Sequence, residues 1–124
     1  MAADWWKLCR DAGMTVDGGT VVVDLSDGRR HTVEVRDTGD TYALSAVVAR
    51  PAALRETPYV PLLAWHRNRV ARLMGFRLDR RGRLVGESWA PKVGLSAEEF
   101  QFYVRRVALE CDRLEHLLTG MDQE

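Results

Sequence analysis

The chain contains 124 residues, enough for about one domain that buries roughly two-thirds of the surface its unfolded form exposes. Its residues are 46% hydrophobic and 29% charged, which is ordinary for a packed protein and excludes disorder as the default state. Eighteen basic residues balance eighteen acidic ones, so no net charge steers the chain toward nucleic acid or a membrane. We therefore expect a single domain over residues 1–124.

The first element we expect is a short helix that begins at Asp4 and ends at Gly13. Asp4 suits an N-terminal cap, and apolar residues repeat at helical spacing after it: Trp5, Leu8, Cys9 and Ala12. A helix this short is marginal alone, so its aromatic face must dock on the rest of the domain.

Three strands are predicted next: Thr20–Leu25, Arg30–Arg36 and Thr41–Ala49. The first is a β-branched run, and the other two alternate apolar and polar residues. The joints between them are short and contain glycine, which is typical of an antiparallel meander.

Three prolines, Pro51, Pro58 and Pro61, then mark a loop of about ten residues. A loop of this length can carry the chain from the sheet to the layer of helices. Pro61 suits the first turn of a second helix, "PLLAWHRNRVARLM", which ends at Gly75. In the next segment, "FRLDRRGRLV", Asp79 and Gly82 stand at the first and fourth positions of a type I turn. This segment predicts a β-hairpin.

The last element is a long helix that begins with the capping box Ser96-x-x-Glu99, flanked by Leu95 and Phe100 as a hydrophobic staple. One apolar stripe follows, and Gly120 stands at the position of a C-terminal cap. The stripe consists of Phe100, Val104, Val107, Cys111, Leu114 and Leu118. The complete order, α-β-β-β-α-β-β-α, predicts an α+β fold with an antiparallel sheet of about five strands and helices on one face.

No group of residues supports catalysis or metal binding. Gly86-Glu-Ser-Trp-Ala90 resembles a hydrolase nucleophile motif, but Pro91 follows at once, where that motif needs a helix, so Ser88 is not expected to be catalytic. His31, His66 and His116 lie on three elements without ligand spacing. Cys9 and Cys111 lack redox or zinc spacing and are expected to be buried thiols in a reducing compartment. We predict no enzyme, no cofactor and no metal centre.

Arginine and tryptophan are the candidates for binding a partner. Residues 66–83 contain seven arginines and one acidic residue, whereas residues 96–124 contain seven acidic residues and three arginines. These arginines can be solvated, or they can form ion pairs within the fold, several of them with acidic residues of the last helix. Alternatively, they can face an acidic partner. Trp5 and Trp6 cannot both point inward from one helix, so an exposed tryptophan is also expected. The predicted partner-binding residues are Trp65, Arg69, Arg72, Arg77, Arg80, Arg81, Arg83 and Trp6.

Targeting signals are not evident in the sequence. The first residues lack the basic start and the apolar run of a signal peptide. No apolar stretch approaches the ~20 residues that a membrane span needs. We expect a cytoplasmic protein with no membrane contact.

The order of elements resembles the type III secretion chaperone-like fold, and the second half also resembles the bacterial YbjN-like family that shares it. The resemblance is carried by "LAWHRNR" from Leu63, "FRLDRRGRLVGESWAP" from Phe76, and "LSAEEFQFYVRRVALECDRLEHLLTG" from Leu95, which together cover roughly half the chain. These motifs are patterns of hydrophobicity and turns, and the first half of the chain matches only in architecture.

This resemblance implies a non-enzymatic binding domain. Secretion chaperones of this fold are homodimers that hold an extended segment of a partner protein, and YbjN-like proteins are described as sensory-transduction regulators. We therefore expect a dimeric protein-binding module of chaperone or regulator type. Two alternatives stay open. One is a nucleic-acid-binding regulator that uses the same arginines. The other is a small-ligand sensor with a pocket between the sheet and the loop Arg50–Val60, near His66.

Overall fold

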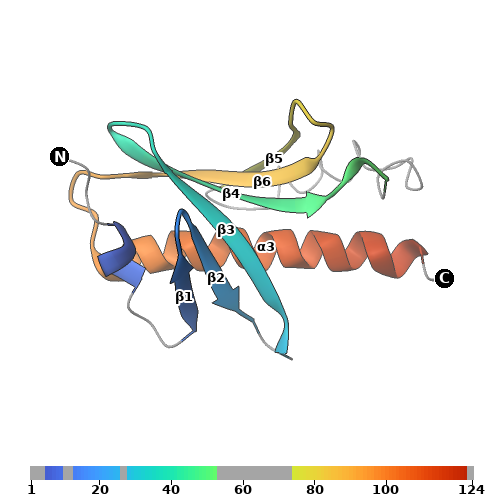
Figure 1. Ribbon diagram of the computed structural model, residues 1–124, viewed down its shortest axis with the longest axis horizontal. Helices are drawn as coiled ribbons and strands as arrows, with labels where there is room; N and C mark the ends of the chain where they lie inside the picture. Colours follow the sequence, from blue (N-terminus) through green and yellow to red (C-terminus); the bar gives the residue numbers. More distant parts are fainter. Residues whose placement is uncertain (1–4, 10–12, 26–27, 53–73, 123–124) are drawn as a thin grey trace.

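The computed structural model describes residues 5–9, 13–25, 28–52 and 74–122 (Figure 1). Its elements in chain order are η1 (Trp5–Cys9), β1 (Met14–Asp17), β2 (Thr20–Asp24), β3 (Arg30–Asp37), β4 (Thr41–Ala49), β5 (Gly75–Leu78), β6 (Leu84–Pro91) and α3 (Ala97–Asp122). The predicted second helix, including Trp65, Arg69 and Arg72, lies outside the described residues.

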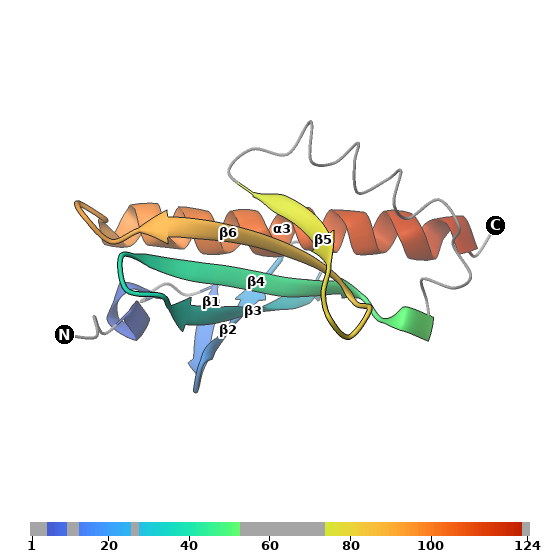
Figure 2. The same cartoon turned by 90° about the horizontal axis from the view of Figure 1, so that it is seen from above.

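The strands form one antiparallel sheet in the order β1-β2-β3-β4-β6-β5. The helix α3 runs across one face of this sheet (Figures 1 and 2). Alternate strand residues, such as Val33 and Leu44, point toward α3 and are fully buried with Phe100 and Val107 of the helix. The core therefore lies between α3 and the sheet, which confirms the predicted α+β class. We call the opposite side of the sheet its outer face.

The predicted strand count was too low, because the sheet has six strands among the described residues. The missed strand is β1, four residues that pair with β2 across the two-residue turn Gly18–Gly19, where Gly18 has a φ of 61°. A strand of this length carries too little alternation to be recognised. The first helix was also predicted to be of the wrong type, since η1 is a 3-10 helix. Asp4 and residues 10–12, which the predicted helix includes, lie outside the described residues.

The helix α3 follows the predicted pattern closely. The Glu99 N–H donates to Ser96 Oγ at 3.1 Å and the Ser96 N–H donates to Glu99 Oε1 at 3.2 Å, which confirms the capping box. All six residues of the predicted apolar stripe are buried. The predicted end was wrong, because α3 continues through Gly120 to Asp122.

The sheet opens between β3 and β4. These strands pair only through Glu34–Asp37 and Tyr42–Ser45. The first half of β3 pairs with β2 instead, while β4 continues beside β6 to Ala49, past an irregularity between Val47 and Ala49. As a result the two strands diverge, and Figure 1 shows β3 turning away from β4.

Candidate functional site

The structure describes five of the eight residues predicted to bind a partner. The arginines gather on the hairpin of β5 and β6, whereas Trp6 lies on η1, near the other end of β6 (Figures 1 and 2). The hairpin residues are Arg77, Arg80, Arg81 and Arg83. These five residues therefore do not form one cluster.

Two of the hairpin arginines are ion-paired inside the hairpin itself. Arg77 Nε donates to Glu87 Oε1 at 2.7 Å, and this hydrogen bond raises the pKa of Arg77. Arg83 Nη2 lies 2.7 Å from Asp79 Oδ2. The sequence left three alternatives for these arginines: solvated, paired within the fold, or facing a partner. The structure shows that Arg77 and Arg83 are paired within the fold. The acidic residues concerned belong to the hairpin and not to α3.

The turn between β5 and β6 presents the other two arginines to solvent. Asp79 organises this turn, because its Oδ1 accepts the N–H groups of Arg81 and Arg83, each at 2.9 Å. The Gly82 N–H donates to the Asp79 carbonyl at 3.0 Å, and Gly82 adopts a φ of 76°. Arg80 and Arg81 are exposed on this well-defined turn, which we call the hairpin tip (residues 79–82).

Exposed aromatic side chains lie toward the other end of β6. Trp89 is 52% exposed and lies on the outer face, since its neighbours Ser88 and Ala90 are buried on the core side. Trp6 is 47% exposed and meets the buried Trp5 edge to face, with ring centroids 6.0 Å apart. The expectation of an exposed tryptophan is confirmed, but Trp89 was not among the predicted partner-binding residues.

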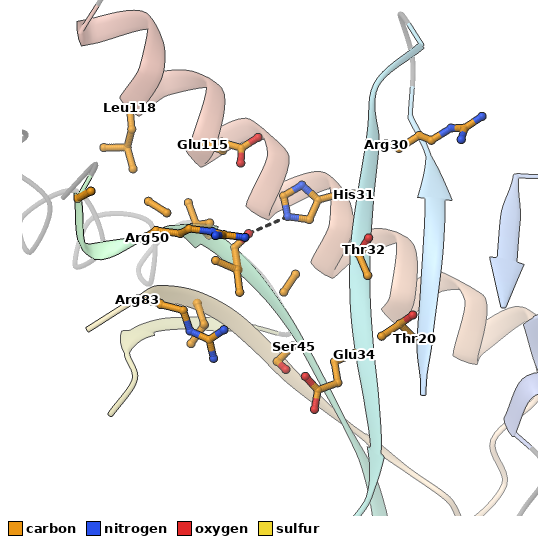
Figure 3. Close-up of a pocket in the computed structure, with 16 residues that line it drawn as sticks. Thr20, Arg30, His31, Thr32, Glu34, Ser45, Arg50, Arg83, Glu115 and Leu118 are labelled. Atoms are coloured by element: carbon orange, nitrogen blue, oxygen red, sulfur yellow. Dashed lines mark hydrogen bonds between the residues drawn. The ribbon is translucent and has the colours of Figure 1, made fainter. Parts of the chain in front are cut away.

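A pocket of about 710 Å³ lies where β3 and β4 diverge (Figure 3). Its walls include Thr32 of β3, Val47 of β4, and Glu115 and Leu118 of α3. Arg50, at the start of the loop after β4, also lines it. The small-ligand alternative predicted a pocket between the sheet and the loop Arg50–Val60, near His66. The pocket reaches Arg50 and Ala52 at the start of that segment, whereas residues 53–60 and His66 lie outside the described residues.

His31 lines the pocket beside two carboxylates of α3. Its Nε2 lies 3.0 Å from the Val47 carbonyl oxygen, which can only accept, so Nε2 carries the hydrogen and the other ring nitrogen is an acceptor in the neutral ring. Asp112 is buried, and its Oδ2 accepts a hydrogen bond from Arg29 Nε at 2.9 Å. One potential ligand atom each of His31, Asp112 and Glu115 lies within 4.8 Å of the others.

The spacing between the three histidines does not reveal this cluster, because only one of its members is a histidine. The available signal was the pair Asp112-x-x-Glu115, since residues three apart lie on the same side of a helix. His31 comes from a strand 81 residues away from Asp112, and no local pattern reveals that it packs against α3.

The candidate nucleophiles of the chain are buried. Ser88 lies in the middle of β6 on the core side and is 2% exposed, far from the strand-to-helix turn that a nucleophile motif requires. Burial raises the pKa of the Cys9 thiol to about 11 and that of the Cys111 thiol to about 12. The prediction of buried thiols is confirmed.

Among the described residues, no helix is both long and apolar enough to cross a membrane. No family model matches the chain, and no curated protein matches it. Solved structures do match.

A chain of the heterodimeric ExoU–SpcU complex from the type III secretion system of Pseudomonas aeruginosa superposes with a TM-score of 0.60 at 20% identity. The match covers 97% of this chain and 99% of that one. The type III secretion chaperone-like fold is therefore the fold of this chain.

Two further structures agree. A chain of the ExsC–ExsE complex has a TM-score of 0.57 at 16% identity, over 84% of this chain and 80% of that one. A chain of the HopA1–SchA chaperone–effector complex has a TM-score of 0.50 at 17% identity, over 98% of this chain and 89% of that one. The predicted fold resemblance is thus confirmed, while the YbjN-like resemblance stays a prediction.

Proposed function

We propose that this protein is a non-enzymatic binding protein of chaperone type, which holds an extended segment of a protein partner on the outer face of its sheet. The observation that carries the proposal is the fold, shared over 97% of the chain with a chain from a heterodimeric secretion complex. The buried positions of Ser88 and both thiols support a role in binding rather than in chemistry.

The distribution of exposed side chains supports a binding surface along β6. Arg80 and Arg81 stand at the hairpin tip, before β6 begins, and Trp89 is exposed near its end. A strand of eight residues, such as β6, spans about 26 Å. An extended segment of similar length would contact the arginines at one end and Trp89 at the other. Tryptophan and arginine are the residues most often found at the energetic centres of interfaces.

The test begins with affinity capture of the tagged protein from a lysate of its own organism after nuclease treatment. A protein that stays bound at near-equal amounts identifies the partner, and its affinity can then be measured with purified components. Loss of the bound material after nuclease treatment would instead favour the nucleic-acid alternative.

Two variants then test the binding surface. Trp89→Ala, and separately the pair Arg80→Glu with Arg81→Glu, should each weaken partner binding about 30-fold, as expected for residues at the centre of an interface. Phe102→Ala is the matched control, because Phe102 is also 52% exposed but lies on α3, away from the outer face. Thermal unfolding should be nearly unchanged in all three. Full-strength binding by both test variants would refute the assignment of the surface.

The proposal includes three further expectations. We expect the protein to be a homodimer, which light scattering coupled to size-exclusion chromatography tests directly. Trp6, together with Trp65, Arg69 and Arg72, is expected to contribute to a partner surface. A cytoplasmic location, which subcellular fractionation tests, is expected of a binding protein that meets its partner before secretion.

A small-ligand sensor is the second candidate, and one observation favours it. The pocket between β3 and β4 has a volume of about 710 Å³, within the range of roughly 300–1,000 Å³ that ligand pockets occupy. Thermal-shift screening of small polar and charged compounds tests it. A compound that raises the Tm of the wild type but not of an Arg50→Ala variant would support ligand binding in this pocket.

A further inference from the structure

The environment of His31 is unusual for a structural histidine, because its ring has oxygen acceptors on two sides. Its Nε2–H donates to the Val47 carbonyl, so its second ring nitrogen offers a lone pair. Within the described part of the chain, that nitrogen has no hydrogen-bond partner, and Figure 3 shows it on the side of Glu115. The imidazole is only 8% exposed. A lone pair that faces carboxylates favours a cation between them.

We propose that His31, Asp112 and Glu115 bind a divalent transition-metal ion, with zinc as the best match. One imidazole nitrogen and two carboxylate oxygens form a donor set that zinc accepts with a water molecule as the fourth ligand. The hydrogen bond from His31 Nε2 to a backbone carbonyl is the outer contact that metal-binding histidines normally make, and it fixes the tautomer that binding needs.

The geometry requires one adjustment. The three potential ligand atoms lie within 4.8 Å of one another, whereas the ligand atoms of a tetrahedral zinc are about 3.3 Å apart. Glu115 can supply the movement, because it is exposed on α3 while His31 and Asp112 are buried. His31 and Glu115 both line the pocket, so an ion can reach the site from solvent.

The charge balance also permits a cation. Arg29 contacts Asp112 through the Oδ2 atom, and a carboxylate has lone pairs enough on its two oxygens to accept a second partner. Of the three candidate ligands, Asp112 and Glu115 are acidic, and Arg29 is the basic residue that contacts Asp112. A bound ion would connect β3 to α3 across the opening of the sheet and would stabilise the folded state increasingly as its concentration rises. This inference is independent of the proposed function.

The test is calorimetric titration of zinc chloride into the metal-free full-length protein, with Tm measured in parallel. We expect one zinc ion per chain and a rise in Tm. Glu115→Gln should weaken binding about tenfold or more, since even the loss of outer-sphere partners costs that much. His31→Gln should do the same. Glu115→Gln is the decisive variant, because an exposed residue can be changed without unfolding the protein.

Two controls separate this site from ordinary surface binding. His116→Gln removes an exposed histidine next to Glu115, and Glu98→Gln removes an exposed carboxylate near the start of α3. Neither should change the affinity. Cobalt in place of zinc should give visible absorption bands that Glu115→Gln diminishes. The proposal is overturned by a lack of saturable binding at one equivalent, by unchanged binding in Glu115→Gln, or by loss of binding in His116→Gln.

Discussion

Gly86 of β6 should not tolerate even one additional methyl group. A Cβ at this position would lie 2.4 Å from Cys111 Sγ, 2.9 Å from Met74 Cε and 3.0 Å from Phe76 Cε1. Nonbonded heavy atoms are most stable at about 3.5–4.0 Å, so the sulfur would have to move by more than about 1 Å. Cys111 lies on α3 with no exposed surface, and its sulfur can move only into packed core or together with the helix.

Overpacking a core typically costs about 1–3 kcal/mol, and three simultaneous contacts place Gly86→Ala at the upper end, about 3 kcal/mol. The free energy of unfolding should be measured from urea titration followed by circular dichroism. Gly19→Ala is the control, since a Cβ there meets nothing within 4 Å. It should change the stability by less than about 0.5 kcal/mol.

A double-mutant cycle identifies the cause of the loss. Cys111→Ala alone should cost about 1–2 kcal/mol through the cavity it leaves. In the double variant, the methyl group added at position 86 occupies part of that cavity, so the two costs should not add. Additive costs, or a Gly86→Ala variant as stable as the wild type, would refute the reasoning. A loss of stability in Gly86→Ala would also explain the glycine that begins Gly86-Glu-Ser-Trp-Ala90. The close packing of α3 would require a glycine there, without any role as a nucleophile motif.

Three further predictions concern the cap, the thiols and the hairpin. Ser96→Ala removes the acceptor of the Glu99 N–H and should lower the free energy of unfolding by about 1 kcal/mol in urea titration. At pH 8 a thiol reagent should modify Cys9 and Cys111 only after denaturation, because burial raises both pKa values to about 11 and 12; fast labelling of the native protein would contradict this. Desolvation raises the pKa of Asp79, but hydrogen bonds from Arg83 and Arg81 outweigh it and lower that pKa below its usual value. The resulting stabilisation is present above about pH 4 and is lost as the pH falls, so Asp79→Asn should flatten the acid side of the stability profile.

The elements that the sequence predicted well are those specified by neighbouring residues. The Ser96–Glu99 cap, the apolar stripe of α3 and the turn at Asp79–Gly82 each depend on contacts within a few positions. The long β3 and β4 were recognised from their alternation. By contrast, β1 is only four residues long, and it is a strand because Val23 and its neighbours on β2 pair with it. Local propensity contains no information on such pairing.

In the candidate sites, too, features that depend on neighbouring residues could be predicted, whereas features that depend on distant contacts could not. Exposure of the hairpin arginines could be inferred from their position beside a turn, but their partners could not. Arg77 lies opposite Val85, so the register of β5 and β6 places it diagonally across from Glu87, within reach of an ion pair. That register is a property of the sheet. The cluster of His31, Asp112 and Glu115 depends on the packing of a strand against a helix more than 80 residues away. No spacing rule within one element could have predicted it.

The divergence of β3 from β4 connects the shape of the sheet to the proposed metal site. Extending the observed register would place His31 opposite Val48 and would pair the backbone of Val47 with β3. Instead the strands separate, and the His31 side chain donates a hydrogen bond to the Val47 carbonyl. A metal ion on the second ring nitrogen would polarise the imidazole and strengthen the Nε2–H donor. Binding at the site should therefore also stabilise the opening of the sheet, and with it the pocket between the two strands.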